Sequence, residues 1–447
     1  MKTTLLPATD SIKRRSFRPS VFLIALVLTA QALPAEGGGP GVRRPIGMSA
    51  QGTVWQIASN IGQGEADHSL APMPAVTLST VDSDLYTGYE NAIYAPDDNT
   101  VFVAYKRFLS DPRVSGYIPA ELRFAKSTDA GQTWSISVID PDAIEEGDTL
   151  NNSVAIDGTQ GSNLYVAYYV RSSGAFVDVK LKFAKSTDAG ATWSTQTVDE
   201  GSAGDYVSIR VLNVNAIVMS AHANGAEEGI HVFISKDGGG TWRDTLMAGG
   251  LGNGLYTSIA AADSRSIWVS YYNSLYPDHT DMNAGKRTAR GSWKSTVVDG
   301  TAGDLDLTGI GSSITVAPDR TVFAAYEADT TSGAFVRVAR TTNGTNWTVV
   351  PVQQDLTIGW NTAIHEFNGK LYLSYWRVPA GERGLAMFAV SGDTGLTWTP
   401  MTIEDPRSVT PYIDCTAPSN FTQFESYQTV DPVTFDQPVL MVARIGG

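Results

Sequence analysis

Cysteine is almost absent from this sequence, with Cys415 as the single example among 447 residues. An internal disulfide is therefore excluded, although an exported protein would be free to form one. A zinc site built on cysteines is excluded too, because such sites need several thiolate ligands. Stability must come from burial of the core, and 42% hydrophobic and 10% aromatic residues suffice for a large one.

Basic residues are outnumbered, with 32 Lys and Arg against 46 Asp and Glu, for a net charge of -14. No stretch of Lys and Arg could follow a nucleic-acid backbone, so we expect no nucleic-acid partner. The acidic balance repels anionic partners and favours neutral or cationic ligands. Motifs for nucleophilic serine, thiol or phosphate-loop chemistry are also missing, and the five histidines show no paired helical spacing.

A long hydrophobic run is missing as well. The apolar segment VFLIALVLTA at 21–30 is too short to span a bilayer comfortably. Lys13, Arg14, Arg15 and Arg18 precede it, and small residues follow at 30–35. This pattern predicts a signal peptide over 1–35, a secreted or periplasmic protein and no stable membrane insertion. A retained membrane anchor is the alternative.

A repeat dominates the rest of the chain. Four copies carry the pattern Ser-x-Asp-x-Gly-x-Thr-Trp with their acidic residues at Asp129, Asp188, Asp237 and Asp393, and two worn copies carry Arg290 and Asn343 instead. Successive copies lie 49 to 59 residues apart. A period near 50 is typical of a four-stranded propeller blade.

Each copy follows a strand–turn–strand pattern, so one repeat is expected to form a four-stranded antiparallel sheet. The sequence thus predicts an all-β, six-bladed β-propeller over residues 85–405. Residues 36–84 are expected to be an N-terminal extension with ring-closing strands, and residues 406–447 a C-terminal closing segment. Seven blades, with one blade mixed from both ends of the chain, are the alternative.

The repeated turn has a mechanical explanation. The Asp carboxylate can accept hydrogen bonds from backbone N–H groups across the turn between the third and fourth strands. Gly supplies a positive φ, and Trp folds back onto the apolar face. We therefore expect a structural role for these aspartates and look for catalysis elsewhere.

Repeats of this kind resemble the Asp-box, or BNR-repeat, propellers of the sialidase (neuraminidase) superfamily. The resemblance implies an active site on the face opposite the box turns, around the channel mouth. It also implies an arginine that clamps the sugar carboxylate and an acid/base Asp, and this chain has Glu90 and Lys106 at those positions. Standard sialidase chemistry is therefore not expected. A clamp assembled from other blades would keep a true exo-sialidase as an alternative.

Candidate site residues lie at the ends of the second strands and the starts of the first strands. The repeating Tyr at the end of the second strand is expected to pack between blades with its hydroxyl toward the channel. Asp148, Asp205 and Asp304 follow a repeated Gly in the loops between blades, where turn capping is the alternative to catalysis. The predicted catalytic groups are Glu90, Asp205, Asp304, Glu327, His222 and Tyr272. The predicted substrate-binding groups are Arg107, Arg171, Tyr169, Trp360, Trp376 and Arg377.

No cofactor and no metal site are expected. Asp304 and Asp306 lack a calcium-loop pattern around them. Aromatic side chains interspersed with a few charges suit sugar rings, so the expected partner is a glycan or glycoconjugate bound or modified at the channel mouth. The alternatives are a true exo-sialidase or other glycoside hydrolase, and a non-catalytic propeller that binds a protein. A monomer is favoured.

Overall fold

The computed structural model describes residues 74–112, 117–143, 145–146, 153–159, 162–171, 179–200, 203–224, 228–250, 252–274, 280–300, 306–355, 358–379, 382–434 and 436–446. The chain divides into two compact units, Met1–Leu70 and Ala71–Gly447, and all described residues belong to the second. The predicted signal peptide at 1–35 lies outside the described residues.

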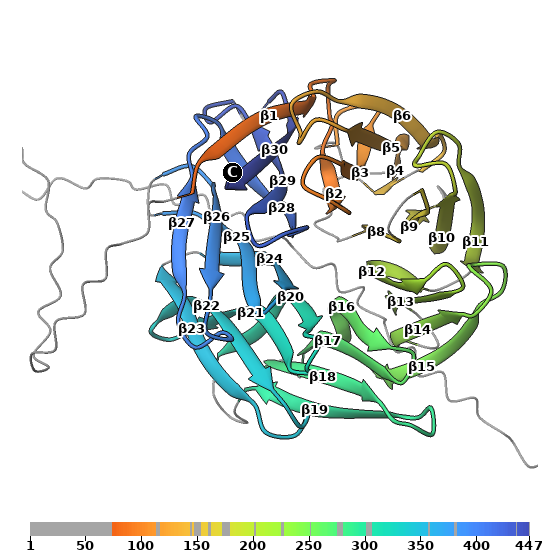
Figure 1. Ribbon diagram of the computed structural model, residues 1–447, viewed down its shortest axis with the longest axis vertical. Coiled ribbons are helices and arrows are strands. Elements are labelled where there is room, and N and C mark those ends of the chain that lie inside the picture. Colours follow the sequence, from red (N-terminus) through yellow and green to blue (C-terminus); the bar gives the residue numbers. More distant parts are fainter. Residues whose placement is uncertain are drawn as a thin grey trace, which may run out of the picture. The chain divides into compact units, whose positions relative to one another are not determined.

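The described secondary structure is entirely β and forms a propeller (Figure 1). Five blades are separate four-stranded sheets. Blade 1 contains β2 (Tyr89–Tyr94), β3 (Val101–Phe108), β5 (Ala120–Ser127) and β6 (Ser135–Asp140), and blade 2 contains β8 (Val154–Gly158), β9 (Leu164–Arg171), β10 (Val179–Ser186) and β11 (Ser194–Glu200). Blade 3 contains β12 (Ala203–Asn213), β13 (Ala216–Ala223), β14 (Gly229–Ser235) and β15 (Arg243–Gly249), and blade 6 contains β24 (Ile358–Phe367), β25 (Lys370–Arg377), β26 (Leu385–Ser391) and β27 (Thr399–Ile403).

The fifth separate sheet, blade 7, is built from both ends of the unit. It contains β28 (Ser408–Thr416), β29 (Thr422–Val430), β30 (Val439–Gly446) and, as its outermost strand, β1 (Val76–Asp82). β1 pairs antiparallel with β30 over Val76 to Asp82, which closes the ring. A short ribbon of β4 (Tyr117–Ile118) and β7 (Glu145–Glu146) lies outside the blades.

One further sheet has eight strands, and it consists of two antiparallel halves. The first half contains β16 (Asn253–Asp263), β17 (Ser266–Ser274), β18 (Thr280–Arg287) and β19 (Trp293–Asp299), and the second contains β20 (Leu307–Val316), β21 (Val322–Thr330), β22 (Gly333–Thr341) and β23 (Thr348–Asp355). A single parallel residue pair, Thr280 and Leu307, joins the halves. Taken as blades 4 and 5, they bring the described total to seven, so the expected count of six is not confirmed.

The order of strands decides which loops share a face. In each blade the first strand lies innermost and the fourth outermost, as the ring of labels in Figure 1 shows. Turns between first and second strands therefore lie on the same face as the box turns between third and fourth strands. The ends of the second strands and the starts of the first strands lie on the opposite face, here called the channel-mouth face.

The box turns form the hydrogen bonds that the sequence predicts. Asp129 Oδ1 accepts the N–H of Thr133 at 2.9 Å, and its Oδ2 accepts the Thr133 hydroxyl at 2.6 Å. The same pair of bonds recurs at Asp188, Asp237 and Asp393. These carboxylates are therefore occupied in holding turns.

Each box turn also packs against the blade before it. The Trp193 ring of blade 2 contacts Phe124 of blade 1, with ring centroids 5.1 Å apart. Gly190 of the same turn has a φ of 85°, and a Cβ there would come within 2.1 Å of Phe124. The Gly of the motif is thus required by close approach as well as by backbone conformation.

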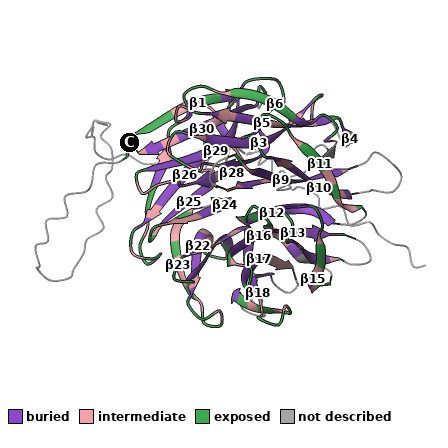
Figure 2. Ribbon diagram, turned by 45° about the vertical axis from the view of Figure 1, so that its right-hand side comes forward, coloured by how far each residue is buried: buried purple, intermediate pink, exposed green. Residues whose placement is uncertain are grey.

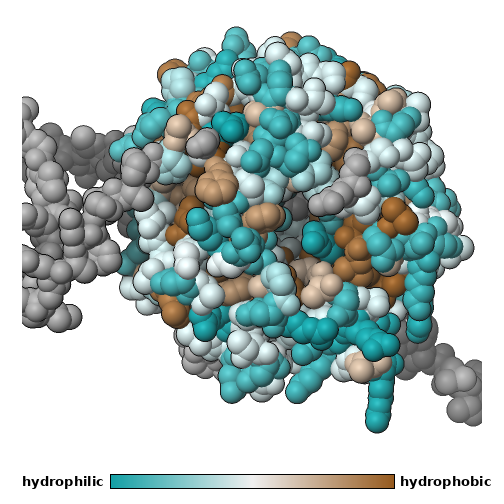
Figure 3. Space-filling model, viewed as in Figure 1, coloured by the Kyte–Doolittle hydropathy of each residue, from teal (hydrophilic) through white to brown (hydrophobic). Residues whose placement is uncertain are grey.

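Burial is concentrated in the middle strands, while outer strands such as β6 are largely exposed (Figure 2). On the face drawn in Figure 3, hydrophobic residues lie in small groups among hydrophilic ones. Scattered apolar residues of this kind are normal for a protein surface.

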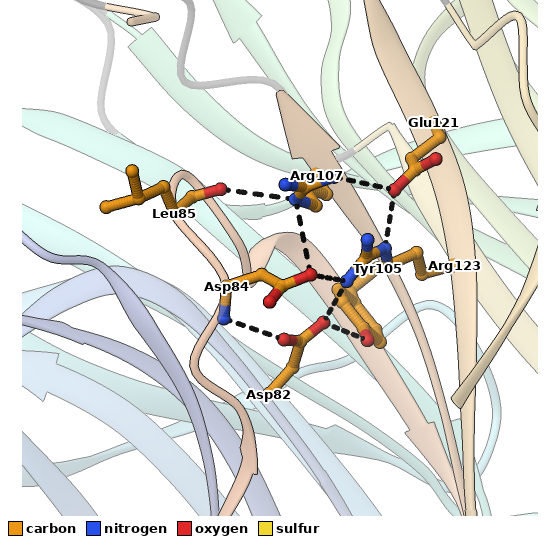
Figure 4. A network of polar contacts seen from close by, with 7 residues as sticks. All are labelled: Asp82, Asp84, Leu85, Tyr105, Arg107, Glu121 and Arg123. Carbon is orange, nitrogen blue, oxygen red and sulfur yellow. Dashed lines mark hydrogen bonds and ion pairs between the residues drawn. The ribbon is translucent and has the colours of Figure 1, made fainter. Parts of the chain in front are cut away.

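A tyrosine at the end of the second strand links each of several blades to the preceding one. Tyr105 donates to Asp82 at 2.6 Å, as Figure 4 shows. Tyr168 and Tyr326 donate in the same way to Asp140 and Asp299, both at 2.7 Å. The expectation that these hydroxyls face the channel is wrong. They bind carboxylates at the ends of outer strands, which satisfies a polar group that would otherwise be buried without a partner.

Candidate functional site

The innermost strands surround a central cavity of about 940 Å³. Its wall runs from Glu90, Thr257 and Tyr412 at the channel-mouth face to Pro96 and Pro318 at the box face. Polar side chains in the wall form hydrogen bonds between the first strands of neighbouring blades. Asp157 accepts the Val211 N–H at 2.7 Å, and Asp414 accepts the Ile93 N–H at 2.9 Å. These two carboxylates hold neighbouring blades together. The candidate site therefore lies at the channel mouth and not along the cavity wall.

The first strands are bulged where they enter the mouth. In blades 1, 3, 4, 5 and 6 the pairing with the second strand skips residues near the start of the first strand. One residue of each bulge has a left-handed backbone, and we call these five residues the bulge ring: Glu90 (φ 49°), Tyr206 (54°), Tyr256 (55°), Gly311 (58°) and Asn361 (54°). A side-chain-bearing residue in this conformation costs about 1 kcal/mol or more, and such strain gathers at functional sites.

Blade 1 contributes a buried ion pair to the mouth. Lys106 Nζ lies 3.5 Å from Glu90 Oε2, and both side chains are almost fully buried. The same ammonium donates to the Tyr169 carbonyl oxygen at 3.0 Å and lies 4.5 Å from the centroid of the Tyr169 ring. These two residues stand where the sialidase resemblance places a clamp arginine and an acid/base Asp. Here they neutralise one another and join blades 1 and 2.

Blade 3 places Asp205 and His222 directly opposite each other on β12 and β13. Asp205 Oδ2 accepts a hydrogen bond from Asn224 at 2.7 Å, while Oδ1 is buried with no hydrogen-bond partner among the described residues. Burial raises the pKa of Asp205, and the charge of Arg171 offsets part of that effect. Burial lowers the pKa of His222 to about 4, so its imidazole is neutral at pH 7.

Three tyrosines continue the mouth from blade 3 into blade 4. Tyr206 and Tyr256 have ring centroids 4.7 Å apart, and their hydroxyls share a hydrogen bond. Tyr256 meets Tyr272 edge to face at 6.2 Å, and Tyr206 meets the His222 ring at 6.4 Å. Burial raises the pKa of Tyr256 to about 12, with a contribution from the charge of Glu327. All three phenols are therefore neutral hydrogen-bonding groups at pH 7.

Blades 5 and 6 add a carboxyl group between tryptophans. Glu327 accepts a hydrogen bond from Trp360, and its Oε2 is buried with no hydrogen-bond partner among the described residues. Burial raises the pKa of Glu327 well above its usual range, and neighbouring Asp329 adds to the effect. Trp360 lies 6.2 Å from Trp376 and is 36% exposed, while the Trp376 indole N–H is held by the Val409 carbonyl at 2.7 Å. This end of the mouth combines an exposed aromatic face with a carboxyl group of raised pKa.

The structure therefore brings most predicted residues into one continuous series across blades 1 to 6. We call this series the channel-mouth arc: Glu90, Lys106, Tyr169, Arg171, Asp205, Tyr206, His222, Tyr256, Tyr272, Glu327, Trp360 and Trp376. Chemically, the arc offers aromatic faces, neutral hydroxyls, a neutral imidazole and two carboxyl groups of raised pKa.

Two predicted clamp arginines are placed differently. Arg107 forms an ion pair with Glu121 at 3.1 Å and lies 3.8 Å from Asp84, within the network of Figure 4. Arg377 donates to Asp355 at 2.6 Å. Both guanidinium groups are therefore used in ion pairs of the blades. Asp304 and Asp148 lie outside the described residues.

Tyr206, Tyr256 and Asn361 belong to the mouth but were missed by sequence reasoning. They stand at the same blade position as Glu90, so an alignment of the first strands would have found them. The sequence pattern did not reveal them, because a bulge shifts the alternation of inward and outward side chains along the strand by one residue. Asn224, which binds Asp205, carries no sequence pattern.

Among the described residues, no group of three or more His, Cys, Asp or Glu side chains is placed to hold a metal ion. No helix in the part of the chain that the structure describes is long and apolar enough to cross a bilayer.

Comparison with known proteins identifies the fold. No protein-family model matches the chain, and no curated protein matches it by sequence. Among solved structures, it is similar to an ulvan lyase from a new family of polysaccharide lyase, bound to -[GlcA(1-4)Rha3S]- (11% identity, 81% of this chain, 95% of that chain, TM-score 0.55). It is similar to the BP39L lectin from Burkholderia pseudomallei (12% identity, 81% and 96%, TM-score 0.54) and to a protein of unknown function from Dyadobacter fermentans (12%, 84% and 100%, TM-score 0.51). The fold is a β-propeller.

Proposed function

We propose that this chain is an exported propeller that binds or acts on carbohydrate through the channel-mouth arc, without standard sialidase chemistry. The single observation that carries the proposal is a set of aromatic rings along the arc together with two buried oxygens, Asp205 Oδ1 and Glu327 Oε2, that have no hydrogen-bond partner in the described part of the chain. Trp360 of blade 6 presents an exposed ring, and Tyr256 and Tyr272 of blade 4 are half-buried. Sugar rings place their C–H faces on such planes while their hydroxyls seek donors and acceptors. Two structures of similar fold are a lectin and a polysaccharide lyase.

The ion pair of Glu90 and Lys106 supports the absence of sialidase chemistry. A clamp for the carboxylate of sialic acid needs an arginine that binds in a bidentate manner. At this position the Glu90 carboxylate instead forms an ion pair with the Lys106 ammonium at 3.5 Å. A glycan without a carboxylate at this point is therefore the better fit.

Catalysis is the second candidate, favoured by the pair of Glu327 and Asp205. Burial raises the pKa of Glu327, which is the direction that a general acid at neutral pH requires. Asp205, on the other side of the tyrosines, is the second carboxyl group of raised pKa in the arc. A glycoside hydrolase uses a pair of carboxyl groups, one protonated as the acid and one ionised as the base or nucleophile.

One experiment tests both candidates. The purified protein is screened against neutral and acidic hexasaccharides and against aryl glycosides that include a sialoside. Saturable binding without turnover identifies a lectin-like propeller, and turnover lost in Glu327→Gln or Asp205→Asn identifies a hydrolase. Binding of no saccharide refutes the proposal. Turnover of the sialoside refutes the part that excludes sialidase chemistry.

A further inference from the structure

The bulge ring carries side chains where its backbone conformation favours glycine. Gly311 shows the unstrained solution, and a Cβ there would come within 2.4 Å of the Asn361 backbone nitrogen. In the other four positions of the ring a side chain is kept despite the left-handed φ. Observed strain of this kind is a reason to look for a function in the side chain itself.

We propose that the side chains of the bulge ring contact a bound neutral oligosaccharide and determine which sugar the mouth accepts. This inference rests on the proposed carbohydrate function and adds both the residues that select the sugar and its class. The ring residues lie at or beside the wall of the central cavity, since Glu90, Val207, Thr257 and Thr362 all line it.

The tyrosine pair supplies a fixed hydrogen-bonding surface. The hydroxyls of Tyr206 and Tyr256 share a hydrogen bond, so the pair keeps one hydroxyl proton and its oxygen lone pairs for a ligand. Tyr206 is buried, and Tyr256 is half-buried. A sugar hydroxyl can therefore bond to the pair while the sugar ring lies against the aromatic face of Tyr256. Because the pair is already ordered, binding costs little side-chain entropy.

Asn361 extends this surface toward the tryptophans. Its Nδ2 donates to the Pro411 carbonyl at 2.7 Å, which fixes the amide and leaves the amide oxygen as an acceptor. The residue is half-buried and directly follows the exposed Trp360. An aromatic plane beside an oriented amide is a common way to bind a pyranose and read its hydroxyls.

The charges around the ring select against acidic sugars. Glu90 already pairs with Lys106, whose ammonium also donates to the Tyr169 carbonyl. The carboxyl groups of Asp205 and Glu327 flank the tyrosine pair, and both have raised pKa values because burial disfavours their charged forms. A carboxylate or sulfate placed among them would meet an environment that already resists negative charge.

The same backbone conformation on the opposite face provides a matched control. Asn368 has a φ of 51° in the turn between β24 and β25, in the same blade as Asn361. Asn361→Gly and Asn368→Gly therefore make the same chemical change and remove the same strain of a side chain at positive φ. Only the first lies at the channel mouth.

The test measures affinity by calorimetry for hexasaccharides of glucose, mannose and rhamnose, and for an oligogalacturonate hexasaccharide. We expect at least one neutral hexasaccharide to bind, with affinity lowered about fivefold or more in Asn361→Gly and in Tyr256→Phe. Asn368→Gly should bind within about twofold of the wild type. Thermal melting of all variants checks that each is folded.

The outcomes separate the inference from the function on which it rests. Neutral binding that is unchanged in Asn361→Gly and Tyr256→Phe overturns the role of the ring and leaves the carbohydrate function standing. Preference for the oligogalacturonate overturns the assigned class of sugar. Failure of the wild type to bind any of the hexasaccharides overturns the inference together with the proposed function.

Discussion

Tyr105 donates a hydrogen bond of 2.6 Å to Asp82, and this contact joins blade 1 to the strand that closes the ring. Asp82 also accepts from Arg123 at 2.7 Å and is almost fully buried. Burial alone would raise the pKa of Asp82, but the bonds from Tyr105 and Arg123 outweigh it and hold the pKa below its usual value. The closing strand is thus fastened by charge as well as by its pairing with β30.

Asp82→Asn should lower the free energy of unfolding by about 2 kcal/mol, because it removes a charged acceptor from two buried donors. Urea denaturation measures the change. Asp84→Asn is the control, since Asp84 also contacts Arg123 but is 54% exposed. It should cost less than about 0.5 kcal/mol. Equal losses in the two variants would contradict the role of Asp82 in ring closure.

The box aspartates predict a dependence of stability on acid. The hydroxyl and N–H of the threonine four residues later hold the pKa of Asp129, Asp188, Asp237 and Asp393 at about 2, below the ordinary 3.8. A lowered pKa stabilises the fold above pH 3.8, and that contribution is lost as pH falls toward 2. The melting temperature should therefore fall steeply across this range. A variant with all four changed to Asn should show a shallower slope, and an unchanged slope would refute the assignment.

Gly190→Ala should destabilise the protein by about 2 kcal/mol or more, since its Cβ would collide with Phe124 and its φ is positive. Gly392→Ala provides the control, because no atom lies within 4 Å of its Cβ position. It should change stability by less than about 0.5 kcal/mol. Thermal and urea denaturation measure both. A Gly190→Ala protein as stable as the wild type would show that the close approach of the two blades is not real.

The buried pair of Glu90 and Lys106 should behave as one unit. Lys106→Met should cost about 3 kcal/mol because it leaves a buried carboxylate without its cation. Adding Glu90→Gln should recover part of that loss, since the double variant buries no charge. A double-mutant cycle by urea denaturation measures the coupling. Additive single changes would mean that the two charges do not interact.

Much of the fold was predictable because it depends on local chemistry that repeats. The box turns needed only Asp, Gly and Trp at fixed spacing, and Asp129 forms the bonds expected of it. The blade count was harder, because blade 7 lacks the box motif and takes β1 from the other end of the unit. Sequence patterns describe neighbours in the chain, whereas β1 and β30 pair across more than 350 residues.

The face on which the candidate residues lie was predictable, but the directions of their side chains were not. Asp205, His222 and Glu327 were placed correctly on one face because strand order alone determines it. The direction of individual side chains was not predictable. Tyr105 and Arg107 point toward Asp82 and Leu85, in and just after β1 of blade 7, whereas Lys106 between them points toward Tyr169 of blade 2. Tyr206 and Tyr256 were missed because the bulges break the alternation on which the prediction relied.

The central claim is that the channel-mouth face binds carbohydrate, and one pair of variants tests it most directly. Trp360 is 36% exposed at the mouth, and Leu396 is 50% exposed in the box turn of the same blade. Calorimetric titration with neutral hexasaccharides should show saturable binding in the wild type and in Leu396→Ala, with loss of about tenfold or more in Trp360→Ala. Equal binding by both variants, or loss only in Leu396→Ala, would contradict the claim.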